Sequence, residues 1–230
     1  MIRQSPAHIY TAKQRGHIET DRHRLIATLN FGAYADATRK PFGALTVVND
    51  ETLAPLMPIT RRLDDTTAML VIPLVGALHY SLGAKEQELV PGEAVVLSPY
   101  SKGTTVTFSN PYEADLINFL YINLKSNGSK GFGVSHINLD IRNTLHPFTQ
   151  LGICGYMGIF DGRNEVLYPV NNTANGLFAF VVNGAFEVNG RLLEERDALA
   201  LWETDAADIE ALSDNAIILL LEVPLNTFTA

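Results

Sequence analysis

Short runs of hydrophobic and β-branched residues recur along the whole chain, and most are bounded by glycine, proline or asparagine. In the first half these runs are GALTVVND (43–50), AMLVIPLVGALHYSL (68–82), EAVVLSP (93–99), GTTVTFS (103–109) and DLINFLYINL (115–124). Runs of this length and composition are typical of β-strands, and the turn residues between them favour hairpins. No segment shows a convincing long amphipathic helical period, so the pattern predicts an all-β protein.

The second half of the chain repeats the order of the first. The strand–glycine–strand segment at 68–82 resembles LFAFVVNGAFEVNG (177–190), and LVPGEAVVLSP (89–99) resembles LLEERDALALW (192–202). The closing apolar run at 115–124 resembles AIILLLEVPL (216–225). Any all-β protein can repeat hairpins, but the ordered match of three segments favours duplication of a whole domain. Each copy has the short strands of a jelly roll.

The expected boundaries follow from this repeat. Residues 1–125 form the first domain, the small and polar stretch SNGSKGFGVS (126–135) forms a linker, and residues 136–230 form the second domain.

Composition narrows the function classes. The chain has 230 residues, of which 47% are hydrophobic and 18% charged, so a substantial core is expected. The net charge of −8 argues against direct binding of nucleic acid, which needs a positive patch. Neither a secretory signal nor an apolar run of membrane-spanning length is found, so we expect a soluble, cytoplasmic protein that does not enter a membrane. The single cysteine, Cys154, rules out an intramolecular disulfide, and we expect its thiol to be buried.

A metal centre inside a barrel of this kind needs histidine and carboxylate groups two positions apart on a strand, because such positions share a face. None of the six histidines stands in an H-x-H pair. His79 alone lies within a clear strand segment, and we expect it to be an exposed or hydrogen-bonded strand residue rather than a ligand.

A family resemblance is carried by RGHIETDRHRLIATLNFGAYADATRKPFGALTVVNDETLAP (15–55), above all by RGH, NFGAYAD and FGALTVVNDETLAP. This segment resembles the N-terminal signature of the pirins, which are bicupin proteins of the cupin superfamily. The resemblance continues through 74–103 and resumes at VVNGAFEVNG and DALALWE, but it is missing around 125–170. It implies an all-β bicupin fold of two tandem jelly-roll β-barrels.

The resemblance also implies where a metal would sit. Typical pirins bind iron through three histidines and a glutamate, in the motifs H-P-H-K-D and H-S-E. Counted back from the glycine turn at Gly76, the first two histidine positions fall at or near Arg62 and Asp64. The second motif falls on VTFSNP, with Val106 and Phe108 at the ligand positions.

These residues do not suit iron. Val106 and Phe108 have no lone pair to offer, and the guanidinium of Arg62 is a permanent competing cation. Phe119 stands near the position of a polar glutamine in typical pirins, so Phe108 and Phe119 are expected to fill the former cavity. Arg62 and Asp64 either form an ion pair inside the barrel or remain solvent-exposed at its mouth. No metal and no other cofactor are therefore expected.

The functional expectation follows from this loss. Pirins are associated with quercetin 2,3-dioxygenase activity and with transcriptional co-regulation. Here we expect a metal-free, non-enzymatic small-molecule-binding or regulatory protein, a monomer or weak dimer with a small-molecule ligand or a protein partner. A quercetinase-like oxygenase with an atypical site, or metal-free catalysis, remains the alternative. The candidate site in the N-terminal barrel cavity comprises Arg62, Asp64, Tyr80, Val106, Phe108 and Phe119.

Overall fold

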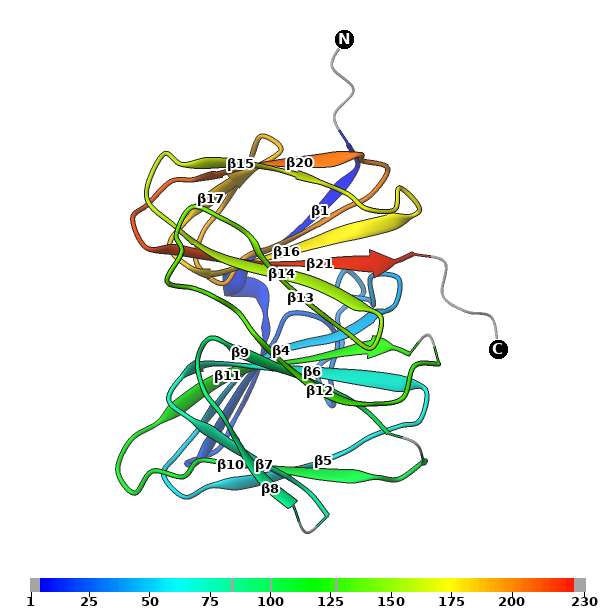
Figure 1. Cartoon of the computed structure of the whole chain (residues 1–230), viewed down its shortest axis with the longest axis vertical. Coiled ribbons are helices and arrows are strands. Elements are labelled where there is room, and N and C mark those ends of the chain that lie inside the picture. The colour runs from blue at the N-terminus through cyan, green and yellow to red at the C-terminus, as the bar shows by residue number, and fades with distance from the viewer. Residues whose placement is uncertain (1–4, 84, 100, 127, 226–230) are drawn as a thin grey trace.

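The structure is a computed structural model, and it describes residues 5–83, 85–99, 101–126 and 128–225. Two β-barrels stack along the long axis of the molecule (Figure 1). The strands pair antiparallel throughout, and the described residues contain one short 3-10 turn, η1 (Ala12–Gln14). In this part of the chain, no helix has the length and apolar character needed to cross a membrane. The prediction of an all-β bicupin is confirmed.

The N-terminal barrel is built from a seven-stranded sheet facing a four-stranded sheet. The seven-stranded sheet has the order β12 (Gly131–His136), β9 (Glu93–Ser98), β6 (Thr67–Val75), β11 (Ile117–Lys125), β4 (Leu45–Leu53), β3 (His23–Ala27) and β2 (Gly16–Glu19). The four-stranded sheet has the order β5 (Pro58–Arg62), β10 (Thr105–Ser109), β7 (Leu78–Leu82) and β8 (Lys85–Leu89).

The C-terminal barrel has the same construction. Its six-stranded sheet has the order β1 (Ala7–Tyr10), β19 (Ala198–Leu201), β16 (Asn175–Asn183), β21 (Ala216–Pro224), β14 (Ile153–Phe160) and β13 (His146–Gln150). Its four-stranded sheet has the order β15 (Glu165–Pro169), β20 (Ala206–Ala211), β17 (Phe186–Val188) and β18 (Arg191–Leu193). The order β9-β6-β11-β4 therefore has its counterpart in β19-β16-β21-β14, as duplication of one domain predicts.

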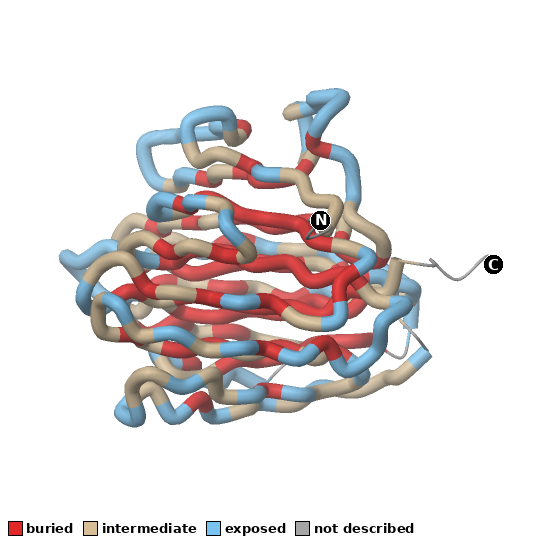
Figure 2. The backbone as a smooth tube through the Cα atoms, turned by 90° about the horizontal axis from the view of Figure 1, so that it is seen from above, coloured by how far each residue is buried: buried red, intermediate tan, exposed pale blue. Residues whose placement is uncertain are grey.

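The hydrophobic core has three parts. One fills the N-terminal barrel, one fills the C-terminal barrel, and the third lies between the barrels, where the seven-stranded sheet faces the six-stranded sheet. Figure 2 shows that buried positions follow the middle of the strands, whereas exposed positions gather in the connecting loops. The third part joins the two barrels into one packed body.

Two strands depart from the expected domain boundaries. β1, near the N-terminus, pairs with β19 in the C-terminal barrel, so residues 1–125 do not all belong to the first barrel. β12 occupies the second half of the stretch expected to be a linker and pairs with β9. The linker prediction was wrong here because backbone pairing holds a glycine-rich strand in place without help from large side chains.

Candidate ligand site in the N-terminal barrel

The interior face of β5 is set by strand alternation. Ile59 is buried in the barrel core and Arg61 shares its face, while Leu63, just after the strand, is buried in the same core. On the neighbouring strand β10, Phe108 is opposite Ile59 and Val106 is opposite Arg61. The four-stranded sheet therefore directs one cation and several apolar groups into the barrel.

This geometry corrects the counted register by one residue. Arg62 is exposed, and its guanidinium lies against Gly103 rather than in the barrel. Asp64 is also exposed, and its carboxylate accepts a bond of 3.3 Å from the backbone N–H of Thr66. Of the two arrangements expected for Arg62 and Asp64, the structure shows the solvent-exposed one outside the barrel core.

The centre of the barrel is closed by aromatic packing. Phe108 comes from the four-stranded sheet and Phe119 from β11 of the opposite sheet, and their ring centroids are 6.1 Å apart. Both side chains are fully buried, as is Val106. Tyr80 also faces inward and donates a hydrogen bond from its hydroxyl to Oε1 of Gln87. The structure thus brings Tyr80, Val106, Phe108 and Phe119 together but not Arg62 or Asp64.

Arg61 supplies a cation to the barrel interior and is held by a carboxylate. Its Nη2 donates to Oε2 of Glu51 at 2.7 Å, and Nε2 of His23 lies 2.9 Å from the same oxygen. Glu51 is fully buried. The guanidinium carbon lies 5.4 Å from the ring centroid of Tyr121 and 6.0 Å from that of Phe31. The ion pair and the two aromatic rings together compensate the charge of a partly buried guanidinium.

A strip of buried polar atoms extends from this pair along β4. Asn49 and Glu51 are two positions apart, so they share the inward face. Both amide atoms of Asn49, Oε1 of Glu51 and Nε of Arg61 have no hydrogen-bond partner within the described part of the chain. Buried polar groups are normally satisfied, so these atoms are the places in the barrel where ordered water would be bound.

The tyrosines of the site are neutral at physiological pH. Burial raises the pKa of Tyr121, although a hydrogen bond from Asn123 to its hydroxyl oxygen opposes the change. Burial likewise raises the pKa of Tyr80, and the charge of Glu93 adds to the effect. Neither phenol is therefore set up to act as a base.

The residues at the barrel centre do not fit an iron or nickel site. Such a centre needs several nitrogen and oxygen donors that converge on one point. Here Val106 and Phe108 are apolar, Arg61 is a permanent cation, and the nearby donors Glu51 and His23 are already engaged with each other. Among the residues that the structure describes, no three histidine, cysteine or acidic side chains come close enough to hold a metal ion.

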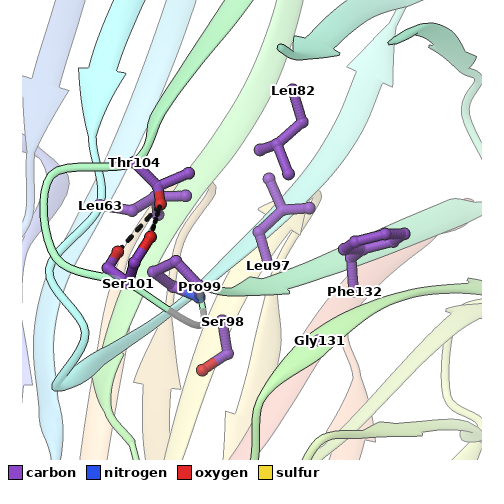
Figure 3. A pocket seen from close by; sticks show the side chains of 9 residues that line it. All are labelled: Leu63, Leu82, Leu97, Ser98, Pro99, Ser101, Thr104, Gly131 and Phe132. Atoms are coloured by element: carbon purple, nitrogen blue, oxygen red, sulfur yellow. Dashed lines mark hydrogen bonds between the residues drawn. The ribbon is translucent and has the colours of Figure 1, made fainter.

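An open cavity lies at the mouth of this barrel instead. It has a volume of about 130 Å³ and is drawn in Figure 3. Its lining residues are Leu63, Leu82, Leu97, Ser98, Pro99, Ser101, Thr104, Gly131 and Phe132. An adjoining cavity of about 80 Å³ shares Leu82, Leu97 and Phe132 with it and adds Tyr80, Lys85 and Gln87.

This double cavity, named here the mouth cleft, is apolar with a few polar groups at its border. Leu63, Leu82 and Leu97 come from the barrel core, whereas the ring of Phe132 is 61% exposed and forms one wall. Thr104 donates its hydroxyl to the carbonyl of Ser101 at 2.9 Å, on the opposite side in Figure 3. Phe132 lies in the stretch taken from sequence as a linker, so the prediction missed this wall.

Two further predictions concern single residues. Nδ1 of His79 lies 3.4 Å from Glu86 and its Nε2 lies 3.2 Å from Glu88, so it is a hydrogen-bonded strand residue as expected. Cys154 is only partly buried, which corrects the expectation of a buried thiol. Its sulfur lies 3.8 Å from the hydroxyl of Tyr156, because β14 turns both side chains to one face.

Comparison with known proteins agrees with this architecture. The family model described as the quercetinase C-terminal cupin domain matches residues 153–223. A search of curated protein sequences finds no match.

Solved structures are similar over nearly the whole chain. A crystal structure of the bacterial pirin YhhW from Escherichia coli, in complex with nickel(II), has a TM-score of 0.84 at 18% identity and covers 95% of this chain and 99% of its own. A quercetin 2,3-dioxygenase from Acinetobacter baumannii has a TM-score of 0.72 at 13% identity, with coverage of 95% and 86%. The chain is therefore a pirin-like bicupin in fold, as the sequence resemblance implied.

Proposed function

We propose that this pirin-like bicupin works without a metal and binds a small, largely apolar molecule in the mouth cleft, as a binding or regulatory protein rather than an oxygenase. The observation that carries the proposal is the set of inward positions on β5 and β10. They hold Arg61, Val106 and Phe108, where a metal centre would need donors. Phe108 and Phe119 close the space behind them.

The size and chemistry of the mouth cleft define the ligand class. Apolar cavities of about 150 Å³ admit a molecule the size of benzene. The main cavity of about 130 Å³, with its neighbour of about 80 Å³, is therefore suited to one aromatic ring and a short extension. Leu82, Leu97 and Phe132 would contact the ring, and Lys85 and Gln87 at the border would contact a hydroxyl or carboxylate group of the ligand.

The alternative function, an oxygenase with an atypical site, draws support from the C-terminal domain match and from the fold shared with quercetin 2,3-dioxygenase. Both observations concern the scaffold, and function depends on the residues of the site. An oxygenase would have to take its metal ligands from side chains other than those on the inward faces of β5 and β10.

The test measures binding and metal content on one preparation. Protein purified without a polyhistidine tag is titrated with catechol and with quercetin by calorimetry, and its iron, nickel and zinc are determined. We expect binding without stoichiometric metal. Phe132→Ala should weaken binding about tenfold, because an aromatic contact of roughly 1.4 kcal/mol is lost. Leu192→Ala is the matched control, since Leu192 on the C-terminal barrel is 68% exposed, close to the 61% of Phe132.

Other outcomes would reject the proposal. A stoichiometric transition metal, together with oxygen-dependent loss of quercetin, would establish the oxygenase alternative. Equal affinities in Phe132→Ala and Leu192→Ala would show that the ligand does not bind in the mouth cleft.

A further inference from the structure

Two arginines from different barrels converge on one carboxylate oxygen. Arg15 lies between η1 and β2, and its Nη1 is 3.5 Å from Oδ2 of Asp50. Arg196 lies in the turn between β18 and β19 of the C-terminal barrel, and its Nη1 is 3.3 Å from the same oxygen. Asp50 is opposite Leu120 on β11, on the face of the sheet that meets the second barrel. The three side chains, named here the junction cluster, therefore bridge the two barrels.

The junction cluster has more buried donors than acceptors. The side chain of Arg15 is 5% exposed, that of Asp50 11% and that of Arg196 21%. The other oxygen of Asp50 accepts a hydrogen bond of 2.6 Å from Asn118. Nε and Nη1 of Arg15 and Nη1 of Arg196 have no acceptor in hydrogen-bond geometry among the described residues. Buried donors of this kind are rarely left without an acceptor.

The charges around the cluster show the same imbalance. Arg39 adds a third guanidinium nearby, and its own N–H groups donate to the carbonyls of Thr28 and Thr11. Burial lowers the pKa of Arg15 and the charges of Arg196 and Arg39 act in the same direction, whereas Asp50 raises it. The cluster is cationic although the whole chain carries −8.

Neighbouring acids do not remove this excess. Glu195 lies 3.7 Å from Nε of Arg196, but its side chain is mostly exposed, so water screens it. Asp197 is buried, but its two oxygens accept from the backbone N–H groups of Ala12 and Glu194. Among the residues that the structure describes, neither acid therefore serves the two arginines as a second buried anionic acceptor.

We infer that the junction cluster binds a small tetrahedral oxyanion, such as inorganic phosphate, between the two barrels. Guanidinium groups recognise oxyanions through paired, charge-assisted hydrogen bonds. Nε of Arg15 would supply one of these bonds, and Nη1 of Arg15 and of Arg196, which reach Asp50 only as long ion pairs outside hydrogen-bond geometry, would supply the others. Asp50 holds the two arginines together and at the same time opposes the anion by its own charge. Because the donors come from both barrels, the anion would stabilise the packed arrangement of the two.

The experiment uses the whole chain, purified without phosphate or sulfate. Its thermal midpoint is measured against sodium phosphate, with sodium chloride at matched ionic strength as the reference, and binding is measured by calorimetry. We expect a saturable rise of the midpoint with phosphate and none with chloride. Arg196→Gln should lower the phosphate affinity about tenfold or more, because one of the two guanidinium groups is lost.

A second variant separates an anion site from a structural ion pair. Asp50→Asn removes the competing charge, so this variant should bind phosphate more tightly than the unchanged protein does. In chloride its thermal midpoint should be lowered, and phosphate should restore it. Arg163→Gln is the matched control, since the side chain of Arg163 is 78% exposed and its partner Glu210 lies outside the junction cluster. It should respond to phosphate as the unchanged protein does.

The inference fails if phosphate acts no differently from chloride. It also fails if Arg196→Gln and Arg163→Gln respond alike, or if Asp50→Asn is not rescued by phosphate. All three outcomes can be measured without substituting Arg15, whose side chain is almost fully buried.

Discussion

Arg61 depends on a single carboxylate oxygen for its place in the N-terminal barrel. Nη2 of Arg61 and Nε2 of His23 both contact Oε2 of Glu51, which is fully buried. Removing one partner of a buried pair leaves the other charge uncompensated, and that is far more costly than replacing both. The interior of the barrel is therefore sensitive to Glu51, although this residue lies outside the positions where a metal centre was sought.

Glu51→Gln should lower the free energy of unfolding by about 3–5 kcal/mol, because the guanidinium of Arg61 stays in the barrel without its counter-ion. The double variant Glu51→Gln with Arg61→Met should recover much of this loss, since both charges are then gone. Urea unfolding followed by circular dichroism measures each value. Glu19→Gln, which removes the partner of His17 in a pair whose side chains are both more than half exposed, serves as control and should cost less than 1 kcal/mol. Equal losses of unfolding free energy in Glu51→Gln and in the control variant would contradict this prediction.

At the scale of residues, the sequence placed Tyr80, Val106, Phe108 and Phe119 correctly in the barrel interior but missed its buried ion pair. Val106, Phe108 and Phe119 were placed inward by the resemblance to the pirin motifs, and the structure buries all three in the barrel. Arg61 was missed because the position was counted back from Gly76 across the turn before β6, and a count across a turn does not fix the strand register. The run PITRR held a better signal: Ile59 is its apolar position, so Arg61, two residues on, had to share that face.

The two glycine turns are the elements that most clearly repeat between the barrels. Gly76 joins β6 to β7 with φ +74°, and Gly184 joins β16 to β17 with φ +75°. A Cβ on Gly76 would lie 2.7 Å from Cγ2 of Ile117, and one on Gly184 would lie 2.4 Å from Oγ of Ser213. Each turn therefore needs glycine both for its backbone and for the space beside it.

Gly76→Ala and Gly184→Ala should each lower the free energy of unfolding by roughly 2–4 kcal/mol, the sum of a backbone and an overpacking penalty. Gly190→Ala is the matched control, because Gly190 has φ +72° but no atom within 4 Å of an added Cβ. It should cost roughly 1 kcal/mol. Chemical denaturation of the three variants gives the comparison. If Gly190→Ala cost as much as the other two, crowding at the turns would have no part in the effect.

Strands were predicted correctly where a pattern of apolar side chains marks them. They were missed where backbone pairing with a distant strand decides the structure. The strands around Gly76 and Gly184 have long apolar runs that only a barrel core can bury. β12 was taken as linker because SNGSKGFGVS is small and polar, yet its Phe132 and Val134 alternate as strand residues do. The pairing of β1 with β19 joins residues about 190 positions apart, and a local pattern contains no information about such a contact.

The molecule as a whole buries several tyrosines, and this predicts its behaviour in alkali. Burial raises the pKa of Tyr10, Tyr80, Tyr121 and Tyr168, and for Tyr168 the hydrogen bond to Glu222 adds to the rise. In the unfolded chain these phenols ionise near pH 10. Their contribution to stability is complete below that pH and is lost as the pH rises above it, because only the unfolded state then releases the protons.

The free energy of unfolding should therefore fall steadily above about pH 10, by up to roughly 1.4 kcal/mol per pH unit for each such tyrosine. Tyr168→Phe should make this fall less steep, because phenylalanine releases no proton. Urea unfolding at several pH values between 8 and 11 gives the slope for both proteins. An unchanged slope in Tyr168→Phe would show that Tyr168 ionises alike in the folded and unfolded states.

The third hydrophobic core, between the barrels, should make the two unfold together. Its members come from both facing sheets, among them Leu120 and Ile122 from β11 and Leu219 and Leu221 from β21. If one barrel unfolded alone, it would expose the apolar face of the other to water, which is unfavourable in proportion to the area. We therefore expect a single unfolding transition for the whole chain rather than one for each barrel.

Trp202 offers a direct test, because it is the single tryptophan of the chain and follows β19 in the C-terminal barrel. Its ring centroid lies 6.3 Å from that of Phe42, from the N-terminal half. Glu51→Gln changes only the interior of the N-terminal barrel, yet it should shift the fluorescence transition of Trp202 to lower urea by as much as the circular dichroism transition. A Trp202 transition that stays in place while the dichroism changes in two steps would mean that the barrels unfold independently. The interface would then be too weak to couple them.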